Sequence, residues 1–241
     1  MKLLKYISDF FFSLRTTLWL LGIMLVLMLA GAFIMPGNKA FQGLHSTPLF
    51  AWIGNQSLQT TWWLWGTIGV LAVMTLNTLF CSIESIVKKR KVTHWLLLIS
   101  PQIIHIGFLF ILLAHLLSGI GAYQQVAPAR EGTVLKLSGT DTVLRIKDIN
   151  IRLDYYGYIS DWAVKIEYRN GDKVLQQDII KPNEPSIYKG LNVNAKNLKP
   201  YPKTALLQLN REPGAFWALV GGIVFMIGIV TLIGLKIRIE K

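Results

Sequence analysis

Histidine supplies the most distinctive chemistry in this chain of 241 residues. Four histidines occur, and two of them, His105 and His115, lie in one long apolar segment. At the rise of an α-helix, His105 lies about 16 Å from His94 and about 20 Å from Ser118, near the middle of a bilayer. An imidazole is a common metal ligand, and an ionisable side chain is costly at that depth. The sequence therefore predicts a functional site at His105.

The two histidines of this segment cannot hold one haem iron between them. They are ten residues apart, about 15 Å along a helix and about 80° out of phase. No other apolar segment contains a histidine. His105 is therefore either an axial haem ligand whose counterpart comes from another subunit, or a residue that hydrogen-bonds a carbonyl on a neighbouring helix. His115 is a weaker cofactor-binding candidate and is otherwise, like His94, an ordinary interfacial residue.

Other polar and aromatic residues have simpler interpretations. Asn77 and Gln102 are expected to hydrogen-bond between helices. A tryptophan group at positions 62, 63 and 65 is typical of an aromatic belt at the bilayer surface. His45 lies in a loop and either contributes to a haem pocket or has no role. Cys81 is the only cysteine, which excludes an internal disulfide, a CxxC pair and a CxxCH haem-attachment site in this chain.

Four long segments without Lys, Arg, Asp or Glu must position these residues. A helix needs about 20 largely apolar residues to cross a bilayer, and lipid offers no partner for a free backbone amide. Overall, 52% of residues are hydrophobic and 16% are charged. The sequence therefore predicts an integral membrane protein with four transmembrane α-helices, at residues 17–35, 62–81, 95–120 and 215–235.

The orientation follows from the basic residues that flank the spans. Lys and Arg are concentrated in residues 1–16, 82–94 and 236–241, whereas the loop at 36–61 contains one lysine. We therefore expect both termini and the basic loop at 82–94 to be cytoplasmic. Residues 36–61 form an outer loop, and residues 121–214 form an extracytoplasmic domain. The net charge of +12 thus serves orientation, and nucleic acid is not an expected partner.

Two features near the N-terminus leave alternatives open. Residues 1–16 have helical apolar spacing, which fits either an interfacial amphipathic helix or a simple continuation of the first span. The Ala-Gly-Ala at 30–32 resembles a signal-peptidase site, but the apolar run continues beyond it. We expect this span to be retained.

The segment at 121–214 has the alternating pattern of strands. Apolar residues alternate with polar ones at 149, 151 and 153, and again at 162, 164, 166 and 168. Asn170-Gly171 then separates two such runs, which is a strong hairpin signal. Residues 204–210 predict a last strand. We expect one small antiparallel β domain, as a sandwich or an open barrel. It contains no histidine, so a docking or structural role is favoured over hydrolysis.

Four patches of the sequence occur in a recognisable order. They are residues 13–18 running to Gly31 and Pro36; Trp62-Trp63 with residues 76–81; His105-Ile106-Gly107 through Gly119-Ile120-Gly121; and Asn183-Glu184-Pro185 with Tyr188-Lys189-Gly190 before Glu212-Pro213-Gly214. Together they resemble the ResB (CcsB) family of system II cytochrome c biogenesis proteins. Many members of this family have a much longer outer domain. This chain resembles a compact version.

The resemblance implies a role in the bacterial cytoplasmic (inner) membrane. Proteins of this family pair with a CcsA-like multispan haem-handling protein, and the pair delivers haem for attachment to apocytochrome c. His105 would then be the haem axial ligand, to a haem b shared transiently with the partner. This chain would be an accessory subunit of a haem lyase complex and not catalytic alone. Two other functions stay open, a b-type cytochrome subunit for electron transfer and a non-catalytic docking or assembly protein.

Overall fold

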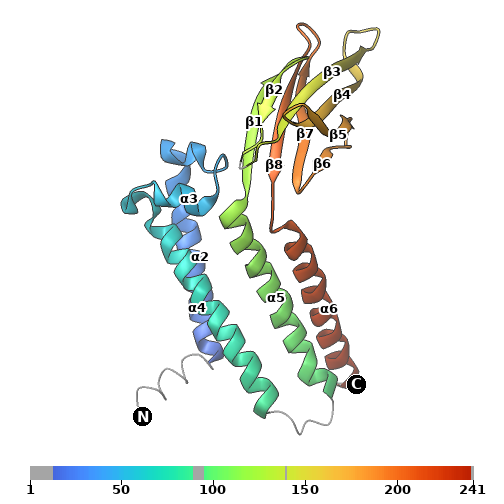
Figure 1. Cartoon of the computed structure of the whole chain (residues 1–241). Coiled ribbons are helices and arrows are strands. Elements are labelled where there is room, and N and C mark those ends of the chain that lie inside the picture. Colours follow the sequence, from blue (N-terminus) through green and yellow to red (C-terminus); the bar gives the residue numbers. More distant parts are fainter. Residues whose placement is uncertain (1–12, 89–94, 139, 240–241) are drawn as a thin grey trace. The chain divides into compact units, whose positions relative to one another are not determined.

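The chain folds as two compact units, described here from a computed structural model of residues 13–88, 95–138 and 140–239 (Figure 1). The helical unit comprises Met1–Gly121 and Pro213–Lys241, and the β unit comprises Ala122–Glu212. Most of the predicted interfacial helix, and the part of the predicted basic loop that contains His94, lie outside the described residues.

Four helices of the helical unit are long and apolar enough to cross a membrane. They are α2 (Leu14–Gly37), α4 (Leu58–Lys88), α5 (Trp95–Gly121) and α6 (Ala215–Ile239). This agrees with the four predicted spans, but the helix ends differ. Residues 14–16 belong to α2, and residues 82–88 continue α4 where a loop was predicted. The ends differ because hydropathy predicts only the apolar part of a helix, whereas the helix continues as long as its backbone hydrogen bonds do. Helix α4 is about 46 Å long, which exceeds a hydrocarbon core of about 30 Å.

The connection between α2 and α4 is folded. It contains a 3-10 helix, η1 (Lys39–Gly43), and a short helix, α3 (Leu49–Gly54). Both pack on the adjoining helix ends through an aromatic and aliphatic cluster of Phe41, Trp52, Ile53 and Trp63. The Phe41 ring lies 5.0 Å from that of Trp52 and 6.1 Å from that of Trp63, between centroids. Trp63 is thus a core residue, whereas Trp62 and Trp65 are exposed as a belt requires.

Helices α2 and α4 form an antiparallel pair. Near one end, the Thr17 hydroxyl donates a hydrogen bond of 2.7 Å to the Asn77 side-chain oxygen. Near the other, Gly31 leaves room for the Trp63 ring, which a β-carbon at position 31 would strike. Several of the residues that carry the ResB resemblance therefore meet one another in this helix pair.

Helices α5 and α6 form a second antiparallel pair, held by close backbone contact. Small residues recur every seven positions, as Gly107, Ala114 and Gly121 on α5, and as Gly214, directly before α6, followed by Gly221 and Gly228 within it. Gly107 faces Gly221, and Ala114 faces Gly214. A β-carbon on Gly221 would lie 2.8 Å from the Gly107 carbonyl oxygen, and one on Gly228 would lie 2.7 Å from an Ile104 side-chain carbon. Such small-residue faces let helix backbones approach closely in lipid.

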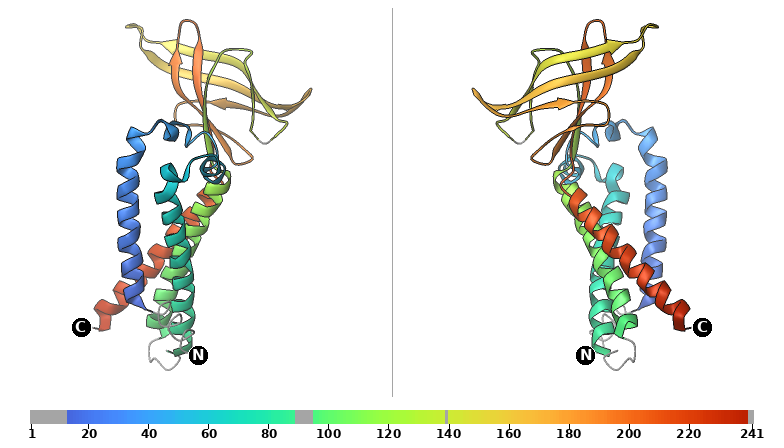
Figure 2. Two further views of the ribbon diagram at one scale, coloured as in Figure 1. Left: turned by 90° about the vertical axis from the view of Figure 1, so that its left-hand side faces the viewer. Right: turned by 90° about the vertical axis from the view of Figure 1, so that its right-hand side faces the viewer.

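The β unit consists of two antiparallel four-stranded sheets whose strands cross at a wide angle (Figure 2). One sheet has the order β1 (Tyr123–Ala129), β8 (Thr204–Arg211), β7 (Leu191–Lys199), β6 (Ser186–Tyr188). The other has the order β2 (Val134–Lys136), β3 (Val143–Leu153), β4 (Ile159–Asn170), β5 (Lys173–Ile180). The predicted small antiparallel domain is therefore a sandwich.

The core of the sandwich lies between the two sheets. Val164, Ile166 and Tyr168 face it from β4, as their alternation predicts. The predicted Asn-Gly hairpin joins β4 to β5, and Gly171 there adopts the left-handed backbone that glycine favours. The Tyr168 hydroxyl shares a hydrogen bond of 2.8 Å with Ser186. Burial raises the pKa of Tyr168 to about 12, because the core disfavours the phenolate.

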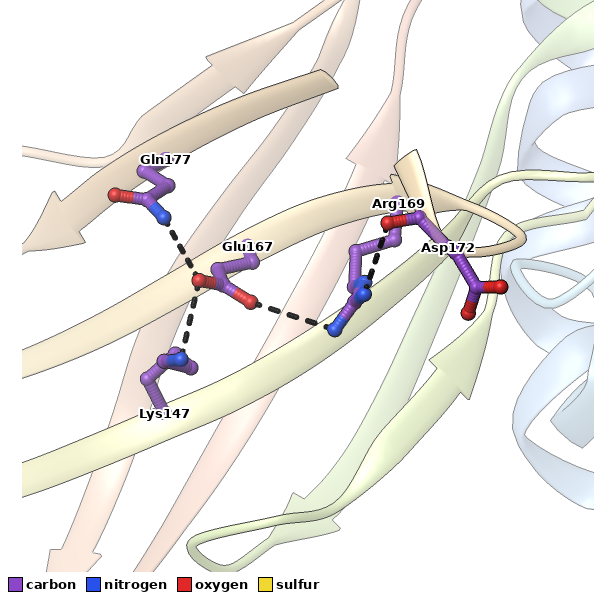
Figure 3. Close-up of polar contacts among 5 residues, drawn as sticks. All are labelled: Lys147, Glu167, Arg169, Asp172 and Gln177. Atoms are coloured by element: carbon purple, nitrogen blue, oxygen red, sulfur yellow. Dashed lines mark hydrogen bonds and ion pairs between the residues drawn. The ribbon is translucent and has the colours of Figure 1, made fainter. Parts of the chain in front are cut away.

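One carboxylate on the opposite face of β4 is buried among polar partners. The Glu167 side chain is 4% exposed and lies 3.2 Å from the Lys147 ammonium, with Arg169 at 3.9 Å (Figure 3). The Gln177 amide donates a hydrogen bond of 2.8 Å to the same carboxylate. These contacts tie β3, β4 and β5 together. The network is a structural device, because a buried carboxylate needs such partners to remain charged.

Replacing Gly221 by Val should separate α5 from α6, because the new side chain would meet the Gly107 carbonyl oxygen. We expect a loss of about 1–3 kcal/mol, the usual effect of overpacking. The measurement is the thermal unfolding midpoint of the purified chain in detergent. Gly222→Val is the matched control, since nothing lies within 4 Å of a β-carbon there. Equal midpoints for the two variants would contradict the close α5–α6 contact.

Replacing Glu167 by Ala should destabilise the β unit by about 2–4 kcal/mol, because two cations and one amide lose a buried acceptor. The control is Glu184→Ala, which removes an exposed ion pair with Lys181 and should cost about 1 kcal/mol or less. Chemical denaturation followed by tryptophan fluorescence compares the two variants. A cost for Glu167→Ala no larger than for the control would show that the network contributes little.

Candidate intramembrane site

The predicted site residue His105 lies where α5 meets α4. Its Nδ1 atom is 2.7 Å from the Ser82 hydroxyl oxygen, and the ring is half-buried. The same Ser82 hydroxyl donates a hydrogen bond of 2.8 Å to the Thr78 carbonyl one turn earlier in α4. No hydrogen bond from a described residue reaches the other ring nitrogen, Nε2. One imidazole nitrogen is thus engaged and the other is available.

The site lies slightly off the centre of α5. His105 is ten residues from Trp95 and sixteen from Gly121, which places it about 5 Å from the midpoint of the helix. Ser82 is six residues before Lys88, the last residue of α4. The contact is therefore displaced toward the helix ends that residues 89–94 connect.

Helix α5 has two faces of different character. Gly107 contacts α6, whereas His105 lies about 160° away around the helix axis and contacts α4 instead. One turn before His105, Gln102 shares its face, because residues three apart are neighbours on a helix. The glycine face thus leaves the polar face of α5 free to take part in other contacts.

Gln102 is buried without a hydrogen-bond partner among the described residues. Its side chain is 8% exposed, and neither amide atom is paired. The prediction that Asn77 and Gln102 both bond between helices is therefore correct for Asn77 and wrong for Gln102.

Neither of the other two described histidines, His115 and His45, joins the site. His115 is exposed, ten residues further along α5, and His45 is exposed in the turn after η1. Within residues 13–88, 95–138 and 140–239, no group of three His, Cys, Asp or Glu side chains could hold a metal ion. Among the described histidines, His105 is the one whose ring contacts α4.

Ser82 is the site residue that sequence reasoning missed. It follows Cys81, the last residue of the predicted second span, and was assigned to the basic loop. Its spacing of four from Thr78 was the available signal, because a serine four residues after a carbonyl commonly bonds back to it within a helix. That signal shows a helical serine but does not reveal its histidine partner on another helix.

Comparisons with protein families, curated proteins and solved structures place the chain beside a solved structure. No protein-family profile matches the chain, and no curated protein matches it in sequence. Among solved structures, "Cytochrome c Heme Lyase CcmF" superposes with a TM-score of 0.46 and 13% identity. The match covers 91% of this chain and 34% of that protein, so this chain spans about a third of its length. A likeness of this size does not establish a family, and the ResB resemblance stays a prediction.

Replacing Gln102 by Met should stabilise the helical unit by about 1–3 kcal/mol, because it removes a buried amide that has no partner and keeps the unbranched shape. Asn77→Leu is the contrasting variant and should cost about 1 kcal/mol, since it breaks the bond from Thr17. Denaturation in mixed micelles gives both values. Destabilisation by Gln102→Met would mean that the amide is paired in the membrane.

Proposed function

We propose that this chain is a subunit of a membrane complex that delivers haem across the bacterial cytoplasmic membrane and supports its attachment to c-type apocytochromes. The observation that supports the proposal is the state of His105. It is a half-buried imidazole in an apolar helix, with Nδ1 bound to Ser82 and Nε2 without a hydrogen bond from the described residues. The role in haem delivery and attachment comes from the resemblance of four sequence patches, in order, to the ResB family.

The residues present fit one axial position of a haem iron. His105 can supply a neutral imidazole nitrogen, whereas His115 and His45 are exposed elsewhere. The second axial ligand would come from a partner, for which a CcsA-like multispan protein is the candidate. Haem is cargo in this proposal, a haem b held transiently between the two proteins. When bound, it supplies the vinyl groups that react with apocytochrome thiols. This chain supplies a ligand and a scaffold, and is not catalytic alone.

The proposed orientation in the membrane assigns the termini and the β unit to opposite sides of the bilayer. With the basic flanks cytoplasmic, both termini face the cytoplasm, and the β unit is extracytoplasmic, where apocytochrome c receives haem. The β unit has its own closed core between two sheets, so it can act as a docking surface without help from the bilayer. It contains no histidine and would not itself ligate haem.

A second candidate function is a non-catalytic docking or assembly protein. The hydrogen bond between His105 and Ser82 favours it, because the imidazole could simply join α4 to α5. In that case His105 would have no ligand role, and the β unit would carry the function. A b-type cytochrome subunit for electron transfer is the remaining alternative, in which haem would be permanent and stoichiometric.

The deciding experiment compares His105→Ala with His115→Ala, a histidine of the same helix that is exposed. Each variant is purified with and without the co-expressed neighbouring membrane protein. The haem absorption spectrum and the amount of mature cytochrome c are measured. We expect His105→Ala to lose at least tenfold of both signals, and His115→Ala to lose neither. Wild-type haem should appear only with the partner.

The outcomes separate the candidates. Unaltered haem and unaltered cytochrome maturation in His105→Ala would refute the ligand role. If the His105→Ala chain still bound its partner and cytochrome maturation were unaltered, the docking or assembly function would be favoured. Stoichiometric haem in the chain purified without a partner would favour the electron-transfer subunit.

A further inference from the structure

The two hydrogen bonds of the Ser82 hydroxyl bear on which nitrogen of His105 carries the proton. A serine hydroxyl has one hydrogen to donate and two lone pairs that accept. Ser82 lies 2.8 Å from the Thr78 carbonyl oxygen, which only accepts, so the hydroxyl hydrogen is directed there. The contact of 2.7 Å with His105 Nδ1 then needs its hydrogen from the ring.

A neutral ring that donates from Nδ1 has its lone pair on Nε2. This is the form that a metal or another electrophile requires, because a protonated nitrogen cannot act as a ligand. In protein metal sites, the hydrogen bond made by one ring nitrogen commonly sets the orientation and tautomer of the other. Ser82 provides such a bond here from within the same chain.

The hydroxyl is well placed to hold that orientation. Thr78 is buried, and its own hydroxyl donates to the Met74 carbonyl, so this stretch of α4 is helical and firmly packed. A relay of Thr78 carbonyl, Ser82 hydroxyl and His105 ring thus runs from α4 to α5.

We propose that Ser82 is a positioning residue that keeps His105 protonated at Nδ1 and presents a free Nε2 lone pair to a ligand. The tautomer part stands on the geometry of this chain. The ligand part rests on the proposed function, in which that ligand is haem iron. Ser82 itself touches neither haem nor apocytochrome.

The first test reads the tautomer without haem. The full chain is labelled with ¹⁵N-histidine and purified in detergent, and the His105→Ala spectrum identifies the His105 signals. In the wild type we expect a protonated, pyrrole-type Nδ1 and an unprotonated, pyridine-type Nε2. A protonated Nε2 with an unprotonated Nδ1 would overturn the proposal.

Three variants follow the same signals. Ser82→Ala removes the acceptor and should shift the ring to a mixture of tautomers, whereas Ser82→Thr keeps a hydroxyl and should restore the wild-type pattern. Thr75→Val is the matched control, because Thr75 bonds back to the Leu71 carbonyl in the same helix. An unchanged ring in Ser82→Ala would refute the role of Ser82. If Ser82→Ala does not fold, the wild-type and Ser82→Thr spectra still decide the tautomer.

The second test separates this inference from the proposed function. Haem retained by the complex with the partner is compared among wild type, Ser82→Ala, Ser82→Thr and His105→Ala. We expect at least a threefold loss in Ser82→Ala and recovery in Ser82→Thr. Full haem in Ser82→Ala with loss in His105→Ala would refute positioning and keep the proposed function. Full haem in His105→Ala would refute the proposed function, while the tautomer result would stand on its own.

Discussion

The absence of water in a bilayer is the constraint on which this structure depends. A polar side chain in a spanning helix has to find its partner within the protein, or remain unpaired at a cost. Thr17 and Asn77 satisfy each other between α2 and α4. Ser82 and His105 do so between α4 and α5. The polar contacts therefore mark where helices must meet, and Gln102 marks a place where this demand is unmet within the described residues.

Different interactions hold the two helix pairs together. Helices α5 and α6 approach through glycine, so their attraction comes from van der Waals contact over a close backbone interface. Helices α2 and α4 combine the Thr17–Asn77 hydrogen bond with the fit of the Trp63 ring over Gly31. The face of α5 that contains Gly107 packs on α6, and the opposite face, which contains His105, contacts α4. The position of the candidate site is thus a consequence of how the second pair packs.

The β unit follows the rules of a soluble domain. Its core is shared between two sheets, and the buried Tyr168 hydroxyl is paired with Ser186. Among the described residues, the side-chain oxygens of Asn192 and Asn194 on β7 are buried without a hydrogen-bond partner. Glu167 is enclosed by Lys147, Arg169 and Gln177 and holds three strands together. None of these groups resembles a catalytic arrangement. The candidate chemistry of this chain therefore rests on His105 in the helical unit.

Local signals in the sequence predicted the four long helices, several of the strands and one residue of the candidate site. The helices η1 and α3 lie in a segment that the sequence predicts as a loop. Apolar length predicted four helices, alternation predicted the strands, and the depth of His105 in its segment singled out that imidazole, because each of these signals is local in the chain. Which side chains meet was decided only by tertiary structure. Ser82 is twenty-three residues from His105, and its importance depends on α4 continuing past the apolar stretch to present a hydroxyl to another helix. The small residues of α5 and α6 are visible in the printed sequence. Only the antiparallel pair shows that the backbone of one helix fills the space that a side chain at Gly107 or Gly221 would occupy.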